Sequence, residues 1–266
     1  MWYSYYSEKT KKECIMSNSE RLSQTAASIG GGKGIFNEDA LGFEVNLQLQ
    51  VAKLIPILQK EYPKIEFLWK KKIKQWELIE KVALIDNVPL EEMYQTVNEN
   101  TFVSPDGGVV YAVVNGKKYP ILISEAKKQG THFFKIDGIT LRECLTKKQI
   151  ALALSRKEQG KGNAIERAFK NIEEFKLYCE DLNYFPYVLF ACGKDFESGS
   201  SILDRLDAMT RYEPRNVNYV ADCEDLETGR KEQKVTAYVQ EDYFTANEMF
   251  DKIYGVAKTS LKCIGV

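Results

Sequence analysis

The stretch PDGGVVYAVVNGKKYPILISEAKK, residues 105–128, decides the fold of this chain. Residues 109–114 and 119–125 are rich in β-branched and aromatic side chains, which favour strands. Between them stands Asn115-Gly116, a dipeptide typical of the tight turn of a β-hairpin, in which both residues take a positive φ. We therefore predict two antiparallel strands that pair across this turn.

Predicted helices and strands alternate on both sides of the hairpin. Apolar residues that recur at helical spacing predict helices at 41–61, 72–84, 163–182, 202–209 and 246–258. Pro56, inside the first of these helices, predicts a kink or a break. Short β-rich or apolar runs predict further strands at 187–192, 217–221 and 234–240. The fold class predicted from this order is α/β, with a central mixed β-sheet flanked by helices on both faces.

The composition is that of a soluble globular protein. A chain of 266 residues, 44% of them hydrophobic, suits one domain with a sizeable core. No apolar run is long enough to cross a bilayer, and the first residues lack a secretory signal, so we expect a cytoplasmic protein without a membrane partner. Because Met16 offers a second start, we expect residues 1–15 to be a loose extension and residues 16–266 to form a single domain.

The cysteine and histidine content disfavours several kinds of active site. The six cysteines form no CxxC pair, and His132 is the only histidine. Zinc ligands normally come in close pairs, so a zinc site is disfavoured, and a histidine-based nuclease or a serine hydrolase is disfavoured as well. We expect the cysteines to be buried thiols: Cys14, Cys144, Cys179, Cys192, Cys223 and Cys263.

Charge is unevenly distributed along the chain although the net charge is only −1. Residues 53–81 hold eight lysines against four acids, and residues 142–170 hold eight basic residues against three acids. Residues 222–251 hold nine acids against three basic residues. Such a polarised molecule could turn a basic side towards phosphates. Solvated helix faces explain the same charge runs equally simply.

Pro105-Asp106 and Glu125-Ala126-Lys127 form the candidate chemical site. Glu125 and Lys127 are two residues apart on one strand, so both side chains project from the same face. Asp106 lies at the start of the partner strand, and the hairpin brings it back beside Glu125. Two carboxylates and one ammonium group are therefore expected to converge.

This set of groups suits metal-assisted hydrolysis of a phosphodiester. Mg²⁺ prefers hard oxygen ligands, so Asp106, Glu125 and the Ala126 carbonyl are the predicted metal ligands. A bound metal ion lowers the pKa of a coordinated water, and Lys127 can neutralise charge that develops on a non-bridging oxygen. We expect neighbouring cations to keep both carboxylates ionised. The pattern is short, however, and a hairpin with a surface Glu/Lys pair would also produce it.

Five short sequence segments, two of which contain the site itself, occur in a specific order: PDGG at 105–108, SEAKKQG at 124–130, GNAIER at 162–167, FPYVLF at 185–190 and ILDRLDAMT at 202–210. In this order the segments resemble the EcoRI family of type II restriction endonucleases, within the PD-(D/E)xK nuclease superfamily. MSNSERLSQ at 16–24 is similar to the amino terminus of that family. The resemblance covers roughly residues 16–210. It implies a restriction-endonuclease-like core with a catalytic hairpin at about 103–127 and a recognition region at about 129–210.

The resemblance also implies an activity, partners and residue roles. The family cuts palindromic double-stranded DNA as a Mg²⁺-dependent homodimer, and its hosts carry a protective DNA methyltransferase. Asp106 and Glu125 match the metal ligands, and Lys127 matches the catalytic lysine. The residues that match or adjoin the family's readers of a central AATT are Gly162, Asn163, Ala164, Arg167, Arg205 and Gln129. Asparagine and arginine are suited to this task, because the amide pairs with adenine and the guanidinium donates to purine acceptors.

Two residues of the recognition region depart from the family's GAATTC-cutting pattern. Lys161 stands where that pattern has a small apolar residue, and a family relative that cuts CAATTG has a basic residue there. Ala208 stands where the pattern has a second arginine. These departures leave the AATT core supported and the outer pair open between GAATTC, CAATTG and a related site. Lys161 could donate to guanine O6 and N7, or it could contact only phosphate.

The leading hypothesis is therefore a type II restriction endonuclease that cleaves DNA at a palindrome with an AATT core. One alternative is a PD-(D/E)xK nuclease of DNA repair or recombination that acts on DNA structure rather than sequence. The other is a DNA-binding protein without catalytic activity, which an intact Asp106, Glu125 and Lys127 disfavours.

Overall fold

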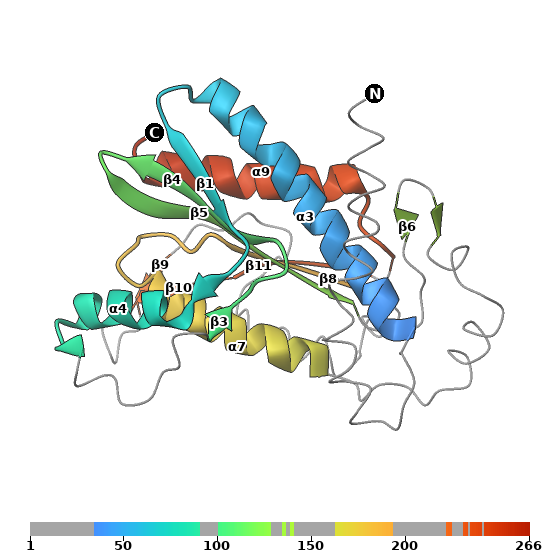
Figure 1. Cartoon of the computed structure of the whole chain (residues 1–266), viewed down its shortest axis with the longest axis horizontal. Coiled ribbons are helices and arrows are strands. Elements are labelled where there is room, and N and C mark those ends of the chain that lie inside the picture. Colours follow the sequence, from blue (N-terminus) through green and yellow to red (C-terminus); the bar gives the residue numbers. More distant parts are fainter. Residues whose placement is uncertain are drawn as a thin grey trace.

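A mixed five-stranded sheet forms the centre of the molecule, in the order β1-β4-β5-β8-β11 (Figure 1). In this computed structural model the described residues are 35–90, 101–128, 135–136, 139–140, 163–193, 222–224, 231–233, 235–240 and 242–266. β1 (Glu66–Lys70), β4 (Gly108–Val114) and β5 (Lys117–Lys128) are joined by antiparallel pairing. β8 (Tyr187–Cys192) and β11 (Thr236–Gln240) continue the sheet in parallel to β5. The predicted mixed sheet is thus confirmed.

Within the described residues, three two-stranded ladders accompany this sheet. β2 (Ile73–Lys74) pairs with β3 (Phe102–Val103), β6 (Lys135–Ile136) pairs with β7 (Ile139–Thr140), and β9 (Asp222–Glu224) pairs with β10 (Lys231–Gln233). All three are antiparallel and short, so the large sheet provides the main framework.

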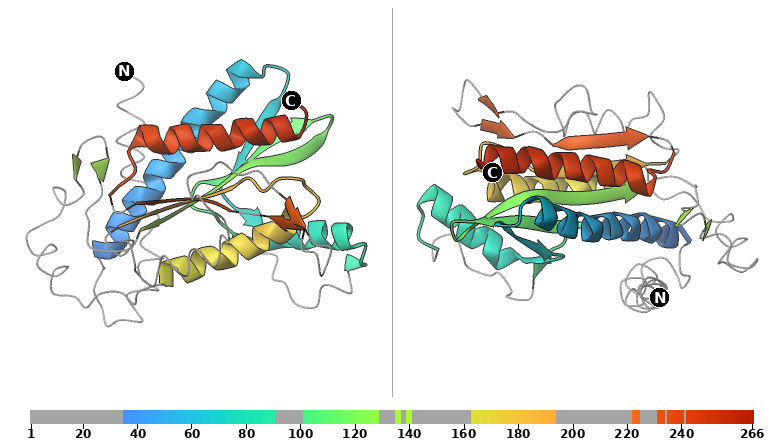
Figure 2. Two further views of the ribbon diagram at one scale, coloured as in Figure 1. Left: turned by 180° about the vertical axis from the view of Figure 1, so that it is seen from behind. Right: turned by 90° about the horizontal axis from the view of Figure 1, so that it is seen from above.

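Helices cover both faces of the sheet, as predicted (Figures 1 and 2). α3 (Ile35–Glu61) and α9 (Ala246–Cys263) pack on one face, where Leu47 and Ile253 are fully buried. α4 (Gln75–Asp86) and α7 (Asn163–Tyr178) pack on the other, and the second core there contains Leu78, Ile172 and Phe175. Each such buried apolar side chain contributes about 1.5–3 kcal/mol relative to exposure, so both faces are held firmly against their helices.

A β-bulge in β5 decides which face carries the chemical groups. Val110 is opposite Leu122 but Tyr111 is opposite Pro120, so Ile121 is an extra residue on β5. Ile121 and Leu122 consequently both contribute to the core under α3 and α9, and the alternation restarts at Ile123, which belongs to the core under α7. Residues 125 and 127 follow Ile123 by steps of two, so they point towards the α7 side of the sheet.

The predicted turn between β4 and β5 is confirmed. Val114 is paired with Lys117, which leaves a two-residue loop. Asn115 has φ 52° and Gly116 has φ 79°, the positive values that the tight hairpin turn requires.

Several predicted boundaries differ from the structure. Helix α3 runs through Pro56, so of the expected kink or break the break is wrong. Leu54 and Leu58 on either side of Pro56 are fully buried, and their packing offsets the cost of about 3 kcal/mol that a proline imposes inside a helix. Helix α7 begins at the predicted residue but ends at Tyr178, whereas α9 extends to Cys263. The predicted helix at 202–209 and the strand at 217–221 lie outside the described residues.

Two further observations bear on the class of protein. Cys179 and Cys192 are buried thiols, as expected, whereas Cys263 is only half-buried. Within the part of the chain that the structure describes, no helix has the length and the apolar character needed to cross a membrane.

Candidate active site

The turn at residues 105–108 places Asp106 in the site. Its positions 107 and 108 must be glycine, because neighbouring atoms leave no room for a Cβ. A Cβ on Gly107 would lie 2.1 Å from Ser124 Oγ and 3.0 Å from Leu47 Cγ. Gly108 has φ 78°, and a Cβ there would lie 2.6 Å from the Lys70 carbonyl oxygen. A side chain at Gly107 would crowd β5 and α3, and a side chain at Gly108 would crowd the end of β1, which explains the two glycines that follow Asp106.

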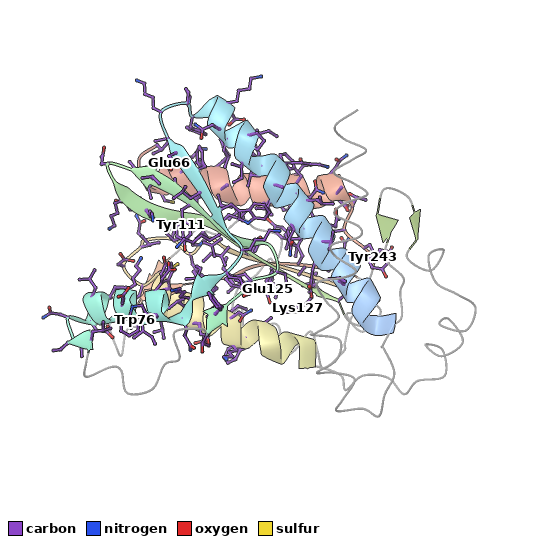
Figure 3. All side chains as sticks on the ribbon, viewed as in Figure 1. Glu66, Trp76, Tyr111, Glu125, Lys127 and Tyr243 are labelled. Carbon is purple, nitrogen blue, oxygen red and sulfur yellow. The ribbon has the colours of Figure 1, made fainter. Side chains whose placement is uncertain are left out.

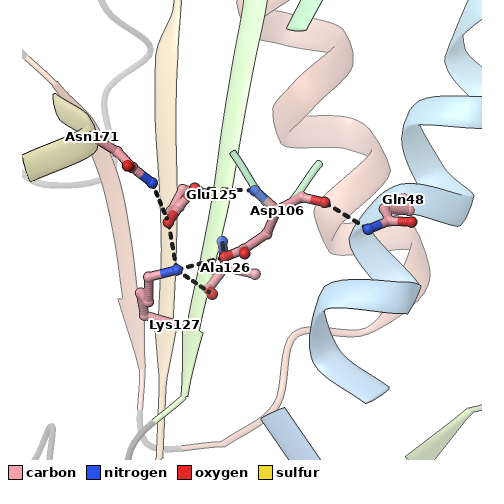
Figure 4. A network of polar contacts seen from close by, with 6 residues as sticks. All are labelled: Gln48, Asp106, Glu125, Ala126, Lys127 and Asn171. Carbon is pink, nitrogen blue, oxygen red and sulfur yellow. Dashed lines mark hydrogen bonds and ion pairs between the residues drawn. The ribbon is translucent and has the colours of Figure 1, made fainter. Parts of the chain in front are cut away.

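The backbone of this turn is anchored from two neighbouring elements. Gln48 of α3 donates from Nε2 to the Asp106 carbonyl at 2.8 Å (Figure 4). Trp69 of β1 donates from Nε1 to the Gly107 carbonyl at 2.9 Å. These bonds add to the backbone bond from the Gly107 N–H to the Ser124 carbonyl, at 2.9 Å, in holding the turn that carries Asp106.

Side-chain bonds join the turn to β5 beyond the last paired residue of β4. The Asp106 N–H donates to Glu125 Oε2 at 3.0 Å, and the Ala126 N–H donates to Asp106 Oδ2 at 3.1 Å. The two carboxylates are therefore each oriented by the other segment's backbone. Asp106 was expected at the start of a strand, but it lies in the turn ahead of β4, where its carboxylate can reach β5.

The structure brings Asp106, Glu125 and Lys127 into direct contact. Lys127 Nζ lies 2.6 Å from Asp106 Oδ2, forms an ion pair with the Glu125 carboxylate, and lies 3.4 Å from the Ala126 carbonyl oxygen (Figure 4). Figure 3 shows Glu125 and Lys127 close together, far along the sheet from Glu66. The ammonium group thus occupies the point where the oxygens of the three predicted metal ligands converge.

Burial changes the ionisation of this site. The Glu125 side chain is 1% exposed, and those of Asp106 and Lys127 are each 14% exposed. The pKa of Glu125 is raised to about 7, because burial and the charge of Asp106 both raise it and Lys127 only partly opposes them. Burial also works against the charge of Lys127, but attraction to Glu125 and Asp106 outweighs it and raises the pKa of the lysine.

The expectation that neighbouring cations keep both carboxylates ionised is therefore wrong for Lys127 acting alone. Lys127 alone does not keep both carboxylates fully ionised near neutral pH, because one ammonium group faces two carboxylates as well as the cost of burying Glu125. A second positive charge is needed to complete the balance.

The donor set fits a hard divalent cation. It consists of two carboxylates and the Ala126 carbonyl, and Lys127 Nζ already contacts all three groups. Across the described residues, no cluster of three or more His, Cys, Asp or Glu side chains gathers. Two carboxylates with further positions left to water suit Mg²⁺, whereas a zinc site would hold a fuller set of protein ligands.

Sequence reasoning missed three residues that shape this site: Gln48, Trp69 and Asn171. Asn171 of α7 donates from Nδ2 to Glu125 Oε1 at 3.1 Å (Figure 4). No local pattern distinguishes these residues, because each contributes through a contact that only the folded chain creates.

The predicted DNA-reading residues are only partly placed. Lys161, Gly162, Gln129 and Arg205 lie outside the described residues. Asn163, Ala164 and Arg167 lie in the first turns of α7, where the structure describes the backbone alone. The structure therefore shows that α7 begins at Asn163, and that the same helix reaches Glu125 through Asn171.

A mixed sheet that presents an aspartate, a glutamate and a lysine in this arrangement defines a nuclease core of the PD-(D/E)xK class. The family model described as restriction endonuclease EcoRI matches residues 29–202. The type II restriction enzyme EcoRI of Escherichia coli is 30% identical over 279 aligned residues, which cover 93% of this chain and 94% of that protein. The type II restriction enzyme RsrI of Cereibacter sphaeroides is 28% identical, over 88% of this chain and 89% of that protein. This chain belongs to the EcoRI family of restriction endonucleases.

The similarity to EcoRI extends further along the chain than the short sequence segments indicated. An alignment that covers 93% of the chain must continue beyond residue 210, although the family model itself ends at residue 202. Membership of this family supports the restriction-enzyme hypothesis over a repair nuclease or a DNA-binding protein without activity.

Proposed function

We propose that this chain is a Mg²⁺-dependent type II restriction endonuclease that hydrolyses double-stranded DNA at a palindromic site with an AATT core. The observation that carries the proposal is the contact of Lys127 with both Asp106 and Glu125 at the end of β5. Two relatives named as type II restriction enzymes, similar over most of the chain, give it independent support.

The residues of the site have two different roles in hydrolysis: metal binding and activation of the attacking water. Asp106, Glu125 and the Ala126 carbonyl would hold Mg²⁺, which when bound supplies a water of lowered pKa and offsets negative charge on the phosphate. Lys127 orients the attacking water and neutralises charge that develops on a non-bridging oxygen. The turn at 105–108 and strand β5 hold the two carboxylates and the Ala126 carbonyl in place, whereas the Lys127 ammonium would have to withdraw from them when a metal ion binds.

The first turn of α7 is proposed to read the AATT core. Asn163 and Arg167 would hydrogen-bond the adenines in the major groove, while Gly162 and Ala164 permit close approach to the pyrimidines. Lys161, Arg205 and Gln129 would add contacts around this core. The outer pair gives GAATTC, CAATTG or a related site, and Lys161 is the residue on which that choice depends most directly.

A palindromic site implies a homodimer, because two-fold symmetry in the protein matches two-fold symmetry in the DNA. Sedimentation of the protein with and without DNA tests this proposal, with a dimer expected in both cases. A host that carries such an enzyme would also need a DNA methyltransferase that protects the same site.

Digestion of plasmid DNA in Mg²⁺, followed by sequencing of the ends, tests the proposed function directly. Ends that all derive from one palindrome containing AATT are the expected result, and EDTA should abolish them. Random ends, ends that depend on branched or damaged DNA, or no cleavage by the folded protein would contradict the proposal.

A further inference from the structure

The Glu125 carboxylate receives hydrogen-bond donors from three separate parts of the fold. Oε2 accepts from the Asp106 N–H of the turn at 3.0 Å. Oε1 is contacted by Lys127 of β5 and accepts from Asn171 Nδ2 of α7 at 3.1 Å (Figure 4). With only 1% of this side chain exposed, these donors rather than water determine how the carboxylate is oriented.

Asn171 and Lys127 occupy different lone-pair directions of Glu125 Oε1. A carboxylate oxygen offers about two lone-pair directions. Asn171 takes one of them, and Lys127 takes the one that also faces Asp106 Oδ2 and the Ala126 carbonyl. If a divalent cation takes the place of the Lys127 ammonium, Asn171 and the Asp106 N–H together still fix both oxygens of Glu125. The carboxylate would then keep its present plane and would be held as a ligand for the metal ion.

We propose that Asn171 is a positioning residue of the metal site, which orients Glu125 for Mg²⁺ without contacting the metal itself. The inference rests on the proposed function, since it takes Glu125 as a metal ligand. An amide suits this task because it donates a hydrogen bond without bringing a charge. A lysine or arginine at this position would compete with the metal ion, and an aspartate would repel Glu125.

The place of Asn171 in the fold gives this bond a further consequence. Asn171 lies eight residues beyond Asn163, or about 12 Å along α7. The helix that the proposed function assigns to base recognition is therefore hydrogen-bonded to a ligand of the metal.

Substitution of Asn171 tests the inference without relying on DNA cleavage. Asn171→Leu removes the donor at similar volume, and Asn171→Ala removes it by truncation. Glu173→Gln is the matched control, because Glu173 is an exposed residue of the same helix whose ion pair is with Lys176. Titration of each full-length protein with Mn²⁺, monitored by electron paramagnetic resonance, measures metal affinity in the absence of DNA. Thermal melting monitored by circular dichroism shows whether each variant is folded.

Loss of a hydrogen bond to a metal ligand typically costs 10–100-fold in metal affinity, so both Asn171 variants should bind Mn²⁺ about 10–100-fold more weakly. Glu173→Gln should stay within about two-fold of wild type. Unchanged Mn²⁺ affinity in a folded Asn171 variant would overturn the inference, as would an equal loss in Glu173→Gln. A wild-type protein that binds Mn²⁺ but cuts no AATT site would contradict the proposed function and leave the Mn²⁺ comparison valid.

Discussion

Lys127 Nζ lies 2.6 Å from Asp106 Oδ2 and at the same time pairs with the Glu125 carboxylate, so one ammonium group serves two carboxylates. The net charge of the three side chains is therefore negative when all are ionised. A site with this imbalance attracts a further cation, and the Ala126 carbonyl beside it adds one more oxygen donor.

Substitution of Lys127 separates catalysis from binding. Lys127→Ala removes the group that we assign to the attacking water, so the single-turnover cleavage rate should fall by at least about 100-fold. Sequence-specific DNA binding, measured by gel shift in Ca²⁺, should persist because the proposed base contacts belong to other residues. Lys258→Ala is the control. Lys258 of α9 forms an ion pair with Glu61 of α3, and this variant should cleave DNA at the normal rate. Persistent cleavage by Lys127→Ala would show that the active site is assigned wrongly.

Metal affinity should depend on pH through Glu125. Burial and the charge of Asp106 raise the pKa of this carboxyl to about 7, so a proton competes with the metal ion below that pH. The Mg²⁺ concentration that gives half-maximal cleavage should fall as pH rises from about 6 to about 8, with little change above. The slope cannot exceed about ten-fold per pH unit for one proton. A half-saturation value that stays constant over this range would contradict the prediction.

The contribution of Glu125 to the free energy of unfolding, measured without metal ions, should decrease as pH rises. The folded-state pKa of Glu125, about 7, lies above the ordinary value of 4.5 for a glutamate, so the folded state binds more protons than the unfolded state between pH 4.5 and pH 7. Stability from this group is therefore present at low pH and is lost as pH rises towards 7. Denaturant titrations of wild type and Glu125→Gln between pH 5 and 8 check the sign: the difference in stability should change in favour of the variant as pH rises.

The central hairpin and the triad could be predicted because their signals are local. Asn115-Gly116 fixes the turn, and a separation of two residues puts Glu125 and Lys127 on one face. Strand β1 could not be predicted in the same way, because only Phe67 of its five residues is buried. It owes its conformation to antiparallel pairing with β4, a partner some forty residues away in the chain.

The supporting residues of the site were hidden for a related reason. Gln48 and Asn171 lie in helices that read as ordinary amphipathic segments, 58 and 46 residues from the groups they contact. The raised pKa of Glu125 was also missed, because burial is a property of the packed sheet and α7 rather than of the motif. Motifs therefore locate the reacting groups, whereas tertiary structure determines their orientation and charge.

Two glycines at opposite ends of the hairpin allow a test of the turn that carries Asp106. Gly107→Ala places a Cβ 2.1 Å from Ser124 Oγ and 3.0 Å from Leu47 Cγ, so we expect the turn to shift and Asp106 to shift with it. Gly116→Ala meets nothing within 4 Å, and its only cost is strain at φ 79°. We expect Gly107→Ala to lose cleavage activity and about 1–3 kcal/mol of stability. Gly116→Ala should lose about 1–2 kcal/mol and keep full activity at temperatures where it is folded. Equal activity of the two folded variants would show that the turn does not position Asp106.

Lys161 should determine the outer base pair of the recognition site. If Lys161 donates to guanine O6 and N7, Lys161→Ala removes about 1–3 kcal/mol of discrimination at that pair and leaves the AATT core required. Cleavage of a library of duplexes with all outer pairs around AATT measures this directly, and the variant should cut more outer pairs than wild type. A phosphate contact would behave differently: binding would weaken by the same factor on every duplex, and the salt dependence of binding would decrease by about one unit of slope. That second pattern would assign Lys161 to the DNA backbone, and the outer pair would then have to be read by another residue.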